Sequence, residues 1–364
     1  MPRTSQRVEI IDYGRLLAAL AVVVFHYFYN GIANGKIPDI THVDGIAKFA
    51  RYGYLGVDFF FLISGYVISE SARGRGPDRF AVGRVVRLYP TFWVAMIITT
   101  ICSMIARPHF MHVNVGQFIA NLTMVPNVLH RGFIDGVYWT LGYELTFYAG
   151  IFLLLFVGLG KFLSSILAWW LILMSSASVL LPDFSSTFPL AGGYFLLFGC
   201  GAVIASIRVG GWTVLRACSI ALGFAATINF EMSSAVGRIS VAGAALIIVL
   251  MFAVLLAALN RRVAGMRLPG SKFAGYITYP LYLIHAHIGY MLIGRFATES
   301  NKVVVTAVVF IFVLVLAYGL HLAVEVGLRR VSYRVFDATV GAVIRGLHRA
   351  LVPWQKRTRG ERSA

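Results

Sequence analysis

The sequence contains few charges and little of what builds a soluble domain. Of its 364 residues only 13% are charged and 15 are acidic, whereas 59% are hydrophobic. The mean hydropathy of +0.78 is far above that of a soluble domain. The alternating segments of about ten residues that a transmembrane β-barrel requires are absent, and long apolar runs recur along the whole chain. These features predict an all-α fold, a polytopic bundle of transmembrane helices.

Cysteine is also scarce. The three cysteines lie in apolar runs, without the spacing of metal ligands, and we interpret them as packing residues. The loop 107–137 carries His109, His112 and His130, but loop histidines are usually solvated. We therefore predict no metal site.

The apolar runs predict about ten membrane spans. They cover residues 12–30, 54–71, 88–106, 138–158, 163–181, 189–207, 213–230, 238–259, 276–295 and 303–326. We expect them to form one transmembrane domain over residues 1–335, followed by a basic cytoplasmic tail over residues 336–364.

The net charge of +17 is distributed unevenly between the two sides of the predicted bundle. The N-terminus, the even-numbered loops and the C-terminal tail hold 22 of the 32 Lys and Arg residues, the odd-numbered loops hold 6, and four lie within the spans. Because cytoplasmic loops carry the excess of basic residues, both termini are predicted to be cytoplasmic. The same charges suit anionic lipid headgroups of the bilayer better than nucleic acid, which we do not expect as a partner.

Two polar residues share one face of the first span. Arg15 and His26 are eleven residues apart, which at 100° per residue is about 20° from three full helical turns. Along the axis they lie about 16 Å apart, with Arg15 near the cytoplasm and His26 toward the outer side. Since a charge in hydrocarbon is costly, both are functional candidates.

Two carboxylates are expected on the outer side with His26. Asp58 opens the second span and Glu144 lies about six residues into the fourth. Either carboxylate could orient the imidazole and stabilise its cation; Asp58 could equally be a helix-start aspartate favoured by the helix dipole. We take His26, Arg15, Asp58 and Glu144 as the candidate catalytic residues.

The cytoplasmic side carries a cluster of arginines. Arg84 and Arg87 are i,i+3 neighbours on one helical face, and two guanidiniums there suit a phosphate-bearing donor such as a coenzyme A nucleotide. The alternative is that they only set the topology. Farther along, Glu325 and Arg329 are spaced i,i+4 and are expected to form a structural ion pair.

Several motifs, in order, resemble those of the membrane-bound acyltransferase-3 family over about residues 9 to 330. They are Asp12, Arg15 and His26; Gly56-Val-Asp58-Phe-Phe-Phe-Leu-Ile-Ser64-Gly65; Arg84-x-x-Arg87-Leu-Tyr-Pro; Trp139-Thr-Leu-x-Tyr143-Glu144; Tyr279-Pro-Leu-Tyr-Leu-Ile-His285; and Glu325 before a basic exit.

The resemblance implies transfer of an acyl group, usually acetyl, from cytoplasmic acyl-CoA to a hydroxyl of a cell-surface or lipid-linked carbohydrate, such as exopolysaccharide, O-antigen or Nod factor. It implies functional roles for Arg15 and His26, and donor binding at Arg84 and Arg87. Acyl-CoA, usually acetyl-CoA, would be a substrate, and no permanently bound cofactor is expected. We place acceptor binding at Trp139, Tyr143 and His285, although the first two could be interface aromatics.

The same resemblance implies a multi-pass protein of the bacterial inner membrane, with polysaccharide biosynthesis proteins among its candidate partners. The chain departs from some relatives at Leu145, where many have a second glutamate. We also expect no soluble hydrolase-like domain after the last span, because the sequence continues for only about forty residues beyond it. We therefore expect one membrane domain to perform the whole transfer or to hand its product to a separate protein.

Two other functions fit part of the pattern. A proton-coupled transporter of a small polar or sugar-linked substrate could use His26 and Glu144 as relay groups, but no inverted repeats are visible. An inert scaffold for polysaccharide assembly would not need the intact set of polar motif residues.

Overall fold

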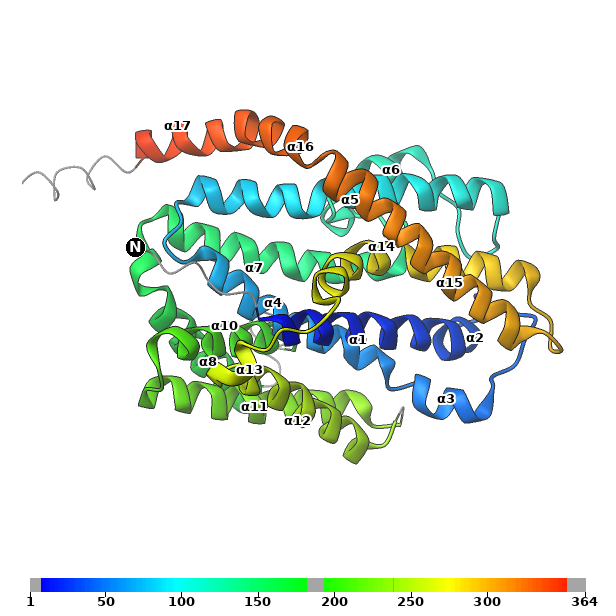
Figure 1. The fold of residues 1–364 in the computed structure, drawn as a ribbon, viewed down its shortest axis with the longest axis horizontal. Helices are drawn as coiled ribbons and strands as arrows, with labels where there is room; N and C mark the ends of the chain where they lie inside the picture. Colours follow the sequence, from blue (N-terminus) through cyan, green and yellow to red (C-terminus); the bar gives the residue numbers. More distant parts are fainter. Residues whose placement is uncertain (1–7, 182–192, 238, 352–364) are drawn as a thin grey trace, which may run out of the picture.

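The described chain is entirely helical. The computed structural model describes residues 8–181, 193–237 and 239–351, and no strand occurs among them (Figure 1). The long helices are α1 (Glu9–Phe25), α4 (Gly56–Ala72), α5 (Pro77–Ala106), α7 (Trp139–Phe156), α8 (Leu163–Leu180), α10 (Tyr194–Gly210), α11 (Val214–Ala235), α12 (Val241–Ala257), α14 (Ser271–Phe296) and α15 (Lys302–Leu320). The short ones are α2 (Gly31–Ala33), α3 (Asp44–Ala50), α6 (Val115–Asn121), α13 (Arg261–Ala264), α16 (Arg329–Phe336) and α17 (Ala342–Leu351). The predicted all-α class is confirmed.

A long helix overlaps each of the ten predicted spans, although residues 189–192 and 238 of two spans lie outside the described ranges. Within those ranges, seven helical segments are long and apolar enough to cross a membrane. The apolar helices α10 and α12 are shorter. The protein is a polytopic helical membrane protein. The count of ten spans and the cytoplasmic termini stay predictions.

Helices α4 and α10 approach each other closely at two glycines. A Cβ added at Gly65 would lie 2.0 Å from the carbonyl oxygen of Phe198, and one at Gly201 would lie 1.9 Å from that of Leu62. Only glycine allows the two backbones to come this close, as is common between membrane helices. Gly65 is therefore a helix-packing residue within its motif.

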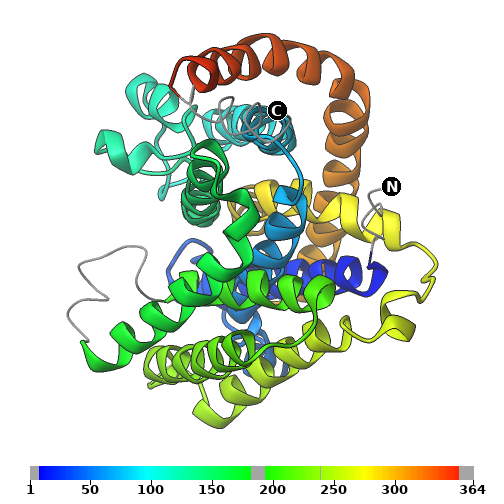
Figure 2. The same cartoon turned by 90° about the vertical axis from the view of Figure 1, so that its left-hand side faces the viewer.

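Helix α14 is the polar centre of the bundle. It packs against α1, α5 and α15 and is buried along most of its length. Beyond α15, the chain continues through a π-helical segment (His321–Gly327) into α16 and α17, which arch around α5 (Figures 1 and 2). The arch places α17 beside the start of α5, where Arg345 pairs with Asp78, and the start of α16 at a cavity that Arg84 and Arg87 also line.

Candidate active site

Three cavities follow one another through the bundle. We name them the histidine cavity, of about 280 Å³, the linking cavity, of about 100 Å³, and the arginine cavity, of about 740 Å³. Neighbouring cavities share lining residues: Val57 and Tyr282 line the first two, and Arg15, Val67, Arg84 and Arg87 line the last two. His26 and Arg15 therefore lie at opposite ends of the linking cavity, as their spacing on one helical stripe predicts.

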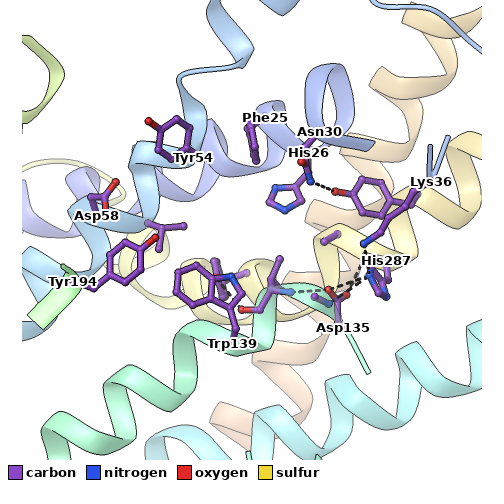
Figure 3. A pocket seen from close by; sticks show the side chains of 16 residues that line it. Phe25, His26, Asn30, Lys36, Tyr54, Asp58, Asp135, Trp139, Tyr194 and His287 are labelled. Carbon is purple, nitrogen blue, oxygen red and sulfur yellow. Dashed lines mark hydrogen bonds and ion pairs between the residues drawn. The ribbon is translucent and has the colours of Figure 1, made fainter. Parts of the chain in front are cut away.

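The histidine cavity is bordered by α1, α4, α14 and the segment before α7, and the imidazole of His26 points into it (Figure 3). Helix α1 ends at Phe25, and a π-helical turn over His26–Asn30 begins at His26 itself. The Nδ1 atom of His26 lies 2.8 Å from the carbonyl oxygen of Val22. Because this geometry makes Nδ1 the donor, Nε2 of a neutral ring keeps its lone pair for chemistry.

A second histidine, rather than a carboxylate, lies beside this ring. The rings of His26 and His285 meet edge to face with centroids 4.9 Å apart. His285 is 1% exposed, its Nδ1 lies 2.8 Å from the Tyr282 carbonyl oxygen, and its Nε2 has no hydrogen-bond partner among the described residues. His285 thus packs behind His26 and does not line the cavity itself.

The expected contact between His26 and a carboxylate is absent from the described part of the chain. Asp58 lines the same cavity (Figure 3). Its carboxylate, however, faces that of Glu231 on α11, and both residues are 2% exposed. Glu144 lines the linking cavity, where it accepts a hydrogen bond from Tyr148. The backbone of Val22 therefore orients His26, and the prediction that Asp58 or Glu144 does so is wrong.

Arg15 lies between the linking and arginine cavities, on the same face of α1 as His26. Glu144 and Asp12 are the carboxylates that face its guanidinium. A half-buried cation is less costly beside such partners. Glu144 thus belongs with Arg15 rather than with His26.

Arg84 and Arg87 lie inside α5, which begins at Pro77, eleven residues before the predicted span. Arg84 stacks on Tyr148 at 5.5 Å, and Arg87 pairs with Glu325 at 3.1 Å. The other Glu325 oxygen lies 2.8 Å from Nδ1 of His321. The predicted ion pair between Glu325 and Arg329 is therefore wrong: the π-helical segment His321–Gly327 breaks the i,i+4 register on which it rested.

The predicted acceptor-binding aromatics differ in position. Trp139 lines the histidine cavity, whereas Tyr143 does not. Tyr143 packs behind it, with ring centroids 5.6 Å from Trp139, 5.8 Å from Phe61 and 5.3 Å from Tyr194. Tyr143 can support Trp139, but it does not face the cavity.

Most of the chain that lines these cavities also matches a known protein family. A family model described as an acyltransferase domain, that of the acyltransferase-3 family, matches residues 8–322. The chain belongs to the acyltransferase-3 family. The matched range contains His26, Asp58 and Glu144, and it ends before Glu325, Arg329 and Arg330, which complete the arginine cavity.

One curated relative is the peptidoglycan O-acetyltransferase OatA of Listeria monocytogenes serovar 1/2a. It is 28% identical over 127 residues, which are 33% of this chain and 18% of the relative. The acyltransferase-3 chain thus matches only about a fifth of that protein's length. No solved structure matches the chain.

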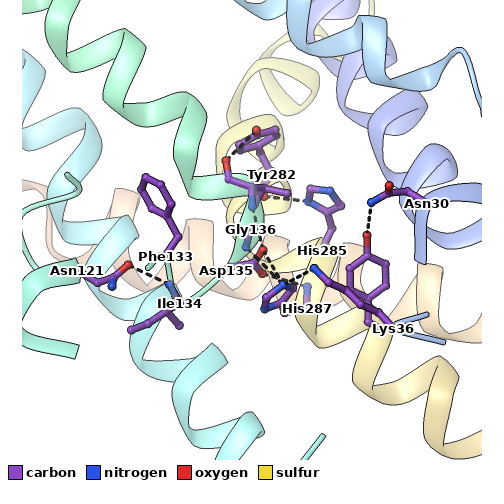
Figure 4. A network of polar contacts seen from close by, with 12 residues as sticks. Asn30, Lys36, Asn121, Phe133, Ile134, Asp135, Gly136, Tyr282, His285 and His287 are labelled. Atoms are coloured by element: carbon purple, nitrogen blue, oxygen red, sulfur yellow. Dashed lines mark hydrogen bonds and ion pairs between the residues drawn. The ribbon is translucent and has the colours of Figure 1, made fainter. Parts of the chain in front are cut away.

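Lys36, Asp135 and His287 form a polar network at one end of the histidine cavity of this acyltransferase-3 chain (Figure 4). Nζ of Lys36 lies 3.2 Å from Nε2 of His287. Fully buried Asp135 accepts hydrogen bonds from the backbone N–H groups of His287 at 3.0 Å and Val137 at 3.1 Å. Burial lowers the pKa of the Lys36 ammonium, and the Asp135 carboxylate opposes that shift.

Sequence reasoning did not assign this network a role. Lys36 and Asp135 lie in separate loops. Both contact His287 on α14, which follows them by about 150 residues or more in the sequence. Only His285, two residues before His287, was among the residues that the sequence assigned to a site.

Proposed function

We propose that this protein is an integral-membrane O-acyltransferase. It moves an acyl group, most simply acetyl, from acyl-CoA to a hydroxyl of a carbohydrate. The observation that carries the proposal is the series of three cavities, with arginines at one end and the free Nε2 of His26 at the other. Membership of an acyltransferase family supports it and does not favour the carrier alternative.

The donor enters from the arginine cavity. Arg84 and Arg87 bind its diphosphate, because guanidiniums form strong paired hydrogen bonds with phosphate oxygens. Arg15 lies where the charged part of the donor ends and the narrow linking cavity begins. Phe60, Ile63 and Val67 line that cavity, which suits the uncharged arm that carries the thioester.

The reaction takes place at Nε2 of His26. This nitrogen accepts the proton of the acceptor hydroxyl while the hydroxyl oxygen attacks the thioester carbonyl carbon. The C–S bond then breaks, and the thiolate of coenzyme A takes up the proton. In a two-step route the same nitrogen first attacks the carbonyl carbon, and the C–S bond breaks to release the thiolate of coenzyme A. The acceptor hydroxyl then displaces the acyl group from the imidazole, and its proton passes through the freed nitrogen to the thiolate.

The acceptor binds in the histidine cavity. Trp139, Tyr54 and Tyr194 provide aromatic surface there, and Asn30 and Lys36 provide polar groups. Such a mixture of flat apolar faces and a few fixed polar groups suits a sugar ring. Peptidoglycan is the acceptor in the name of the Listeria relative, and we infer a cell-envelope or lipid-linked carbohydrate for this chain.

This function places the protein in the cytoplasmic membrane of a bacterium, with both termini and the arginine cavity on the cytoplasmic side. Acyl-CoA is then a substrate rather than a bound cofactor. Proteins of polysaccharide biosynthesis would supply the acceptor.

The proposal is tested with purified protein and radiolabelled acetyl-CoA. His26→Ala should lower acyl transfer to a carbohydrate acceptor by more than about 100-fold, because it removes the base or nucleophile. His112→Ala, which changes an exposed loop histidine, is the matched control and should transfer normally. Full activity of His26→Ala would contradict the assignment. Label retained on wild-type protein without acceptor would identify the two-step route.

A further inference from the structure

Three arginines at the arginine cavity have no acidic partner among the residues that the structure describes. Arg75, Arg329 and Arg330 line this cavity and are exposed. No ion pair or hydrogen bond of their side chains occurs within the part of the chain that the structure describes. Arg87 and Arg345, at the same end of the bundle, are paired with Glu325 and with Asp78 and Asp337, respectively.

These three arginines come together from distant parts of the sequence. Arg75 lies in the turn between α4 and α5. Its Nη1 lies 3.9 Å from the position that a Cβ added to Gly83 would occupy, so its guanidinium lies beside the residue that precedes Arg84. Arg329 and Arg330 begin α16, which packs against α5 (Figures 1 and 2). The fold therefore holds three unpaired cations around one opening.

Unpaired cations around one opening repel one another, and a bound dianion removes that cost. Glu325 does not compensate the charge of these arginines, because its two carboxylate oxygens bind Arg87 and His321. A phosphate monoester carries up to two negative charges and can accept several charge-assisted hydrogen bonds. The exposure of the three side chains indicates that such a ligand arrives with the substrate from solution.

The order of groups along coenzyme A matches the order of the cavities. From the thioester the molecule continues through an uncharged arm to a diphosphate and then to a ribose that carries a phosphate monoester. With the thioester at His26, the arm occupies the linking cavity and the diphosphate reaches Arg84 and Arg87. The ribose phosphate then falls in the wider part of the arginine cavity.

We propose that Arg75, Arg329 and Arg330 form a separate subsite for the ribose phosphate monoester of the acyl-CoA donor. This inference rests on the proposed function. It assigns donor selectivity to these three residues. Two of them, Arg329 and Arg330, lie beyond the range that the family model matches. Arg84 and Arg87 bind what all coenzyme A derivatives share, and the three-arginine subsite distinguishes donors with the monoester from those without it.

The test compares acetyl-CoA with 3′-dephospho-acetyl-CoA, in both binding and acyl transfer, on the full-length protein in detergent. Wild type should prefer acetyl-CoA by about 10- to 100-fold in kcat/KM and in affinity, the range expected for hydrogen bonds to a charged group. Arg329→Ala/Arg330→Ala should reduce that ratio to near one and still use the dephospho donor normally. Arg87→Ala should weaken both donors alike.

Arg334→Ala is the matched control, since Arg334 is an exposed arginine of the same helix that does not line the cavity. It should keep the wild-type ratio. Equal use of both donors by wild type, or an equal loss for both donors in the Arg329→Ala/Arg330→Ala variant, would overturn the subsite. So would a variant defect that depends on anionic lipid in the micelle but not on the donor, because the arginines would then bind headgroup phosphate. Selective binding without acyl transfer would support the subsite and contradict the proposed function instead.

Discussion

Asp58 and Glu144 are carboxylates of neighbouring helices with opposite electrostatic surroundings. Asp58 faces another carboxylate, that of Glu231, in a fully buried position. Glu144 accepts a hydrogen bond from Tyr148 and faces the guanidinium of Arg15. Like charges in a low dielectric repel, whereas opposite charges stabilise each other. The same isosteric change should therefore have different effects at the two positions.

We expect Asp58→Asn to leave the melting temperature unchanged or to raise it, because the amide can donate the hydrogen bond to Glu231 and carries no negative charge that would repel it. Glu144→Gln should lower stability by about 1–3 kcal/mol, since Arg15 loses a partner that compensates its charge. Thermal unfolding of the two variants in one detergent compares them directly. A large loss of stability in Asp58→Asn together with none in Glu144→Gln would contradict these charge assignments.

At the level of single residues, the sequence indicated which polar side chains line the cavities better than it indicated which of them contact one another. His26, Asp58, Glu144 and Arg15 all line the three cavities, as expected of costly polar groups in apolar helices. Val22 and Tyr148 are neighbours of His26 and Glu144 four residues away on the same helices, whereas the pairing of Asp58 with Glu231 on α11 depends on helix rotation and depth. Those quantities depend on packing between helices that hydropathy does not encode.

At the level of elements, hydrophobic runs located the long helices well and their ends less well. Helix α5 begins at Pro77, although its first turns are rich in arginine and read as a loop. Helix α15 continues as a π-helical segment from His321, which no periodicity rule anticipates. Both deviations occur at the arginine cavity, where polar side chains rather than lipid contact determine the backbone.

The contact between α4 and α10 gives a prediction at this scale. Gly201→Ala places a methyl group against the carbonyl oxygen of Leu62, so the helices must separate and stability should fall by about 2 kcal/mol or more. Gly150→Ala on α7 is the control, because nothing lies within 4 Å of its added Cβ. Its effect should stay within about 1 kcal/mol and favour the helix. Melting temperatures and the yield of folded protein test the pair; equal behaviour of both variants would count against the close contact.

For the whole molecule, the sequence predicted that Arg15 and His26 lie at different depths on one helical face, and the order of the cavities agrees with this. The sequence did not predict which loops close the path through these cavities. Lys36 and Asp135 reach the histidine cavity from connections that have no periodic pattern, and their partner His287 is far along the chain. Loop placement follows from the assembled bundle, so it becomes visible only when all the helices are in position.

The path itself can be tested by closing it between its two ends. Val57 lines both the histidine cavity and the linking cavity, and Val57→Trp would fill the junction. Acyl transfer should fall by more than about 100-fold, the loss expected when the thioester cannot reach a correctly placed His26. Donor affinity, which depends on the arginine cavity, should stay within about a factor of three. Val304→Trp introduces the same side chain at a position of α15 that is 66% exposed, and it should leave both quantities unchanged. Normal transfer by Val57→Trp would mean that acyl group and acceptor meet by another route, because an indole in a cavity of about 100 Å³ leaves no space for the arm of the donor.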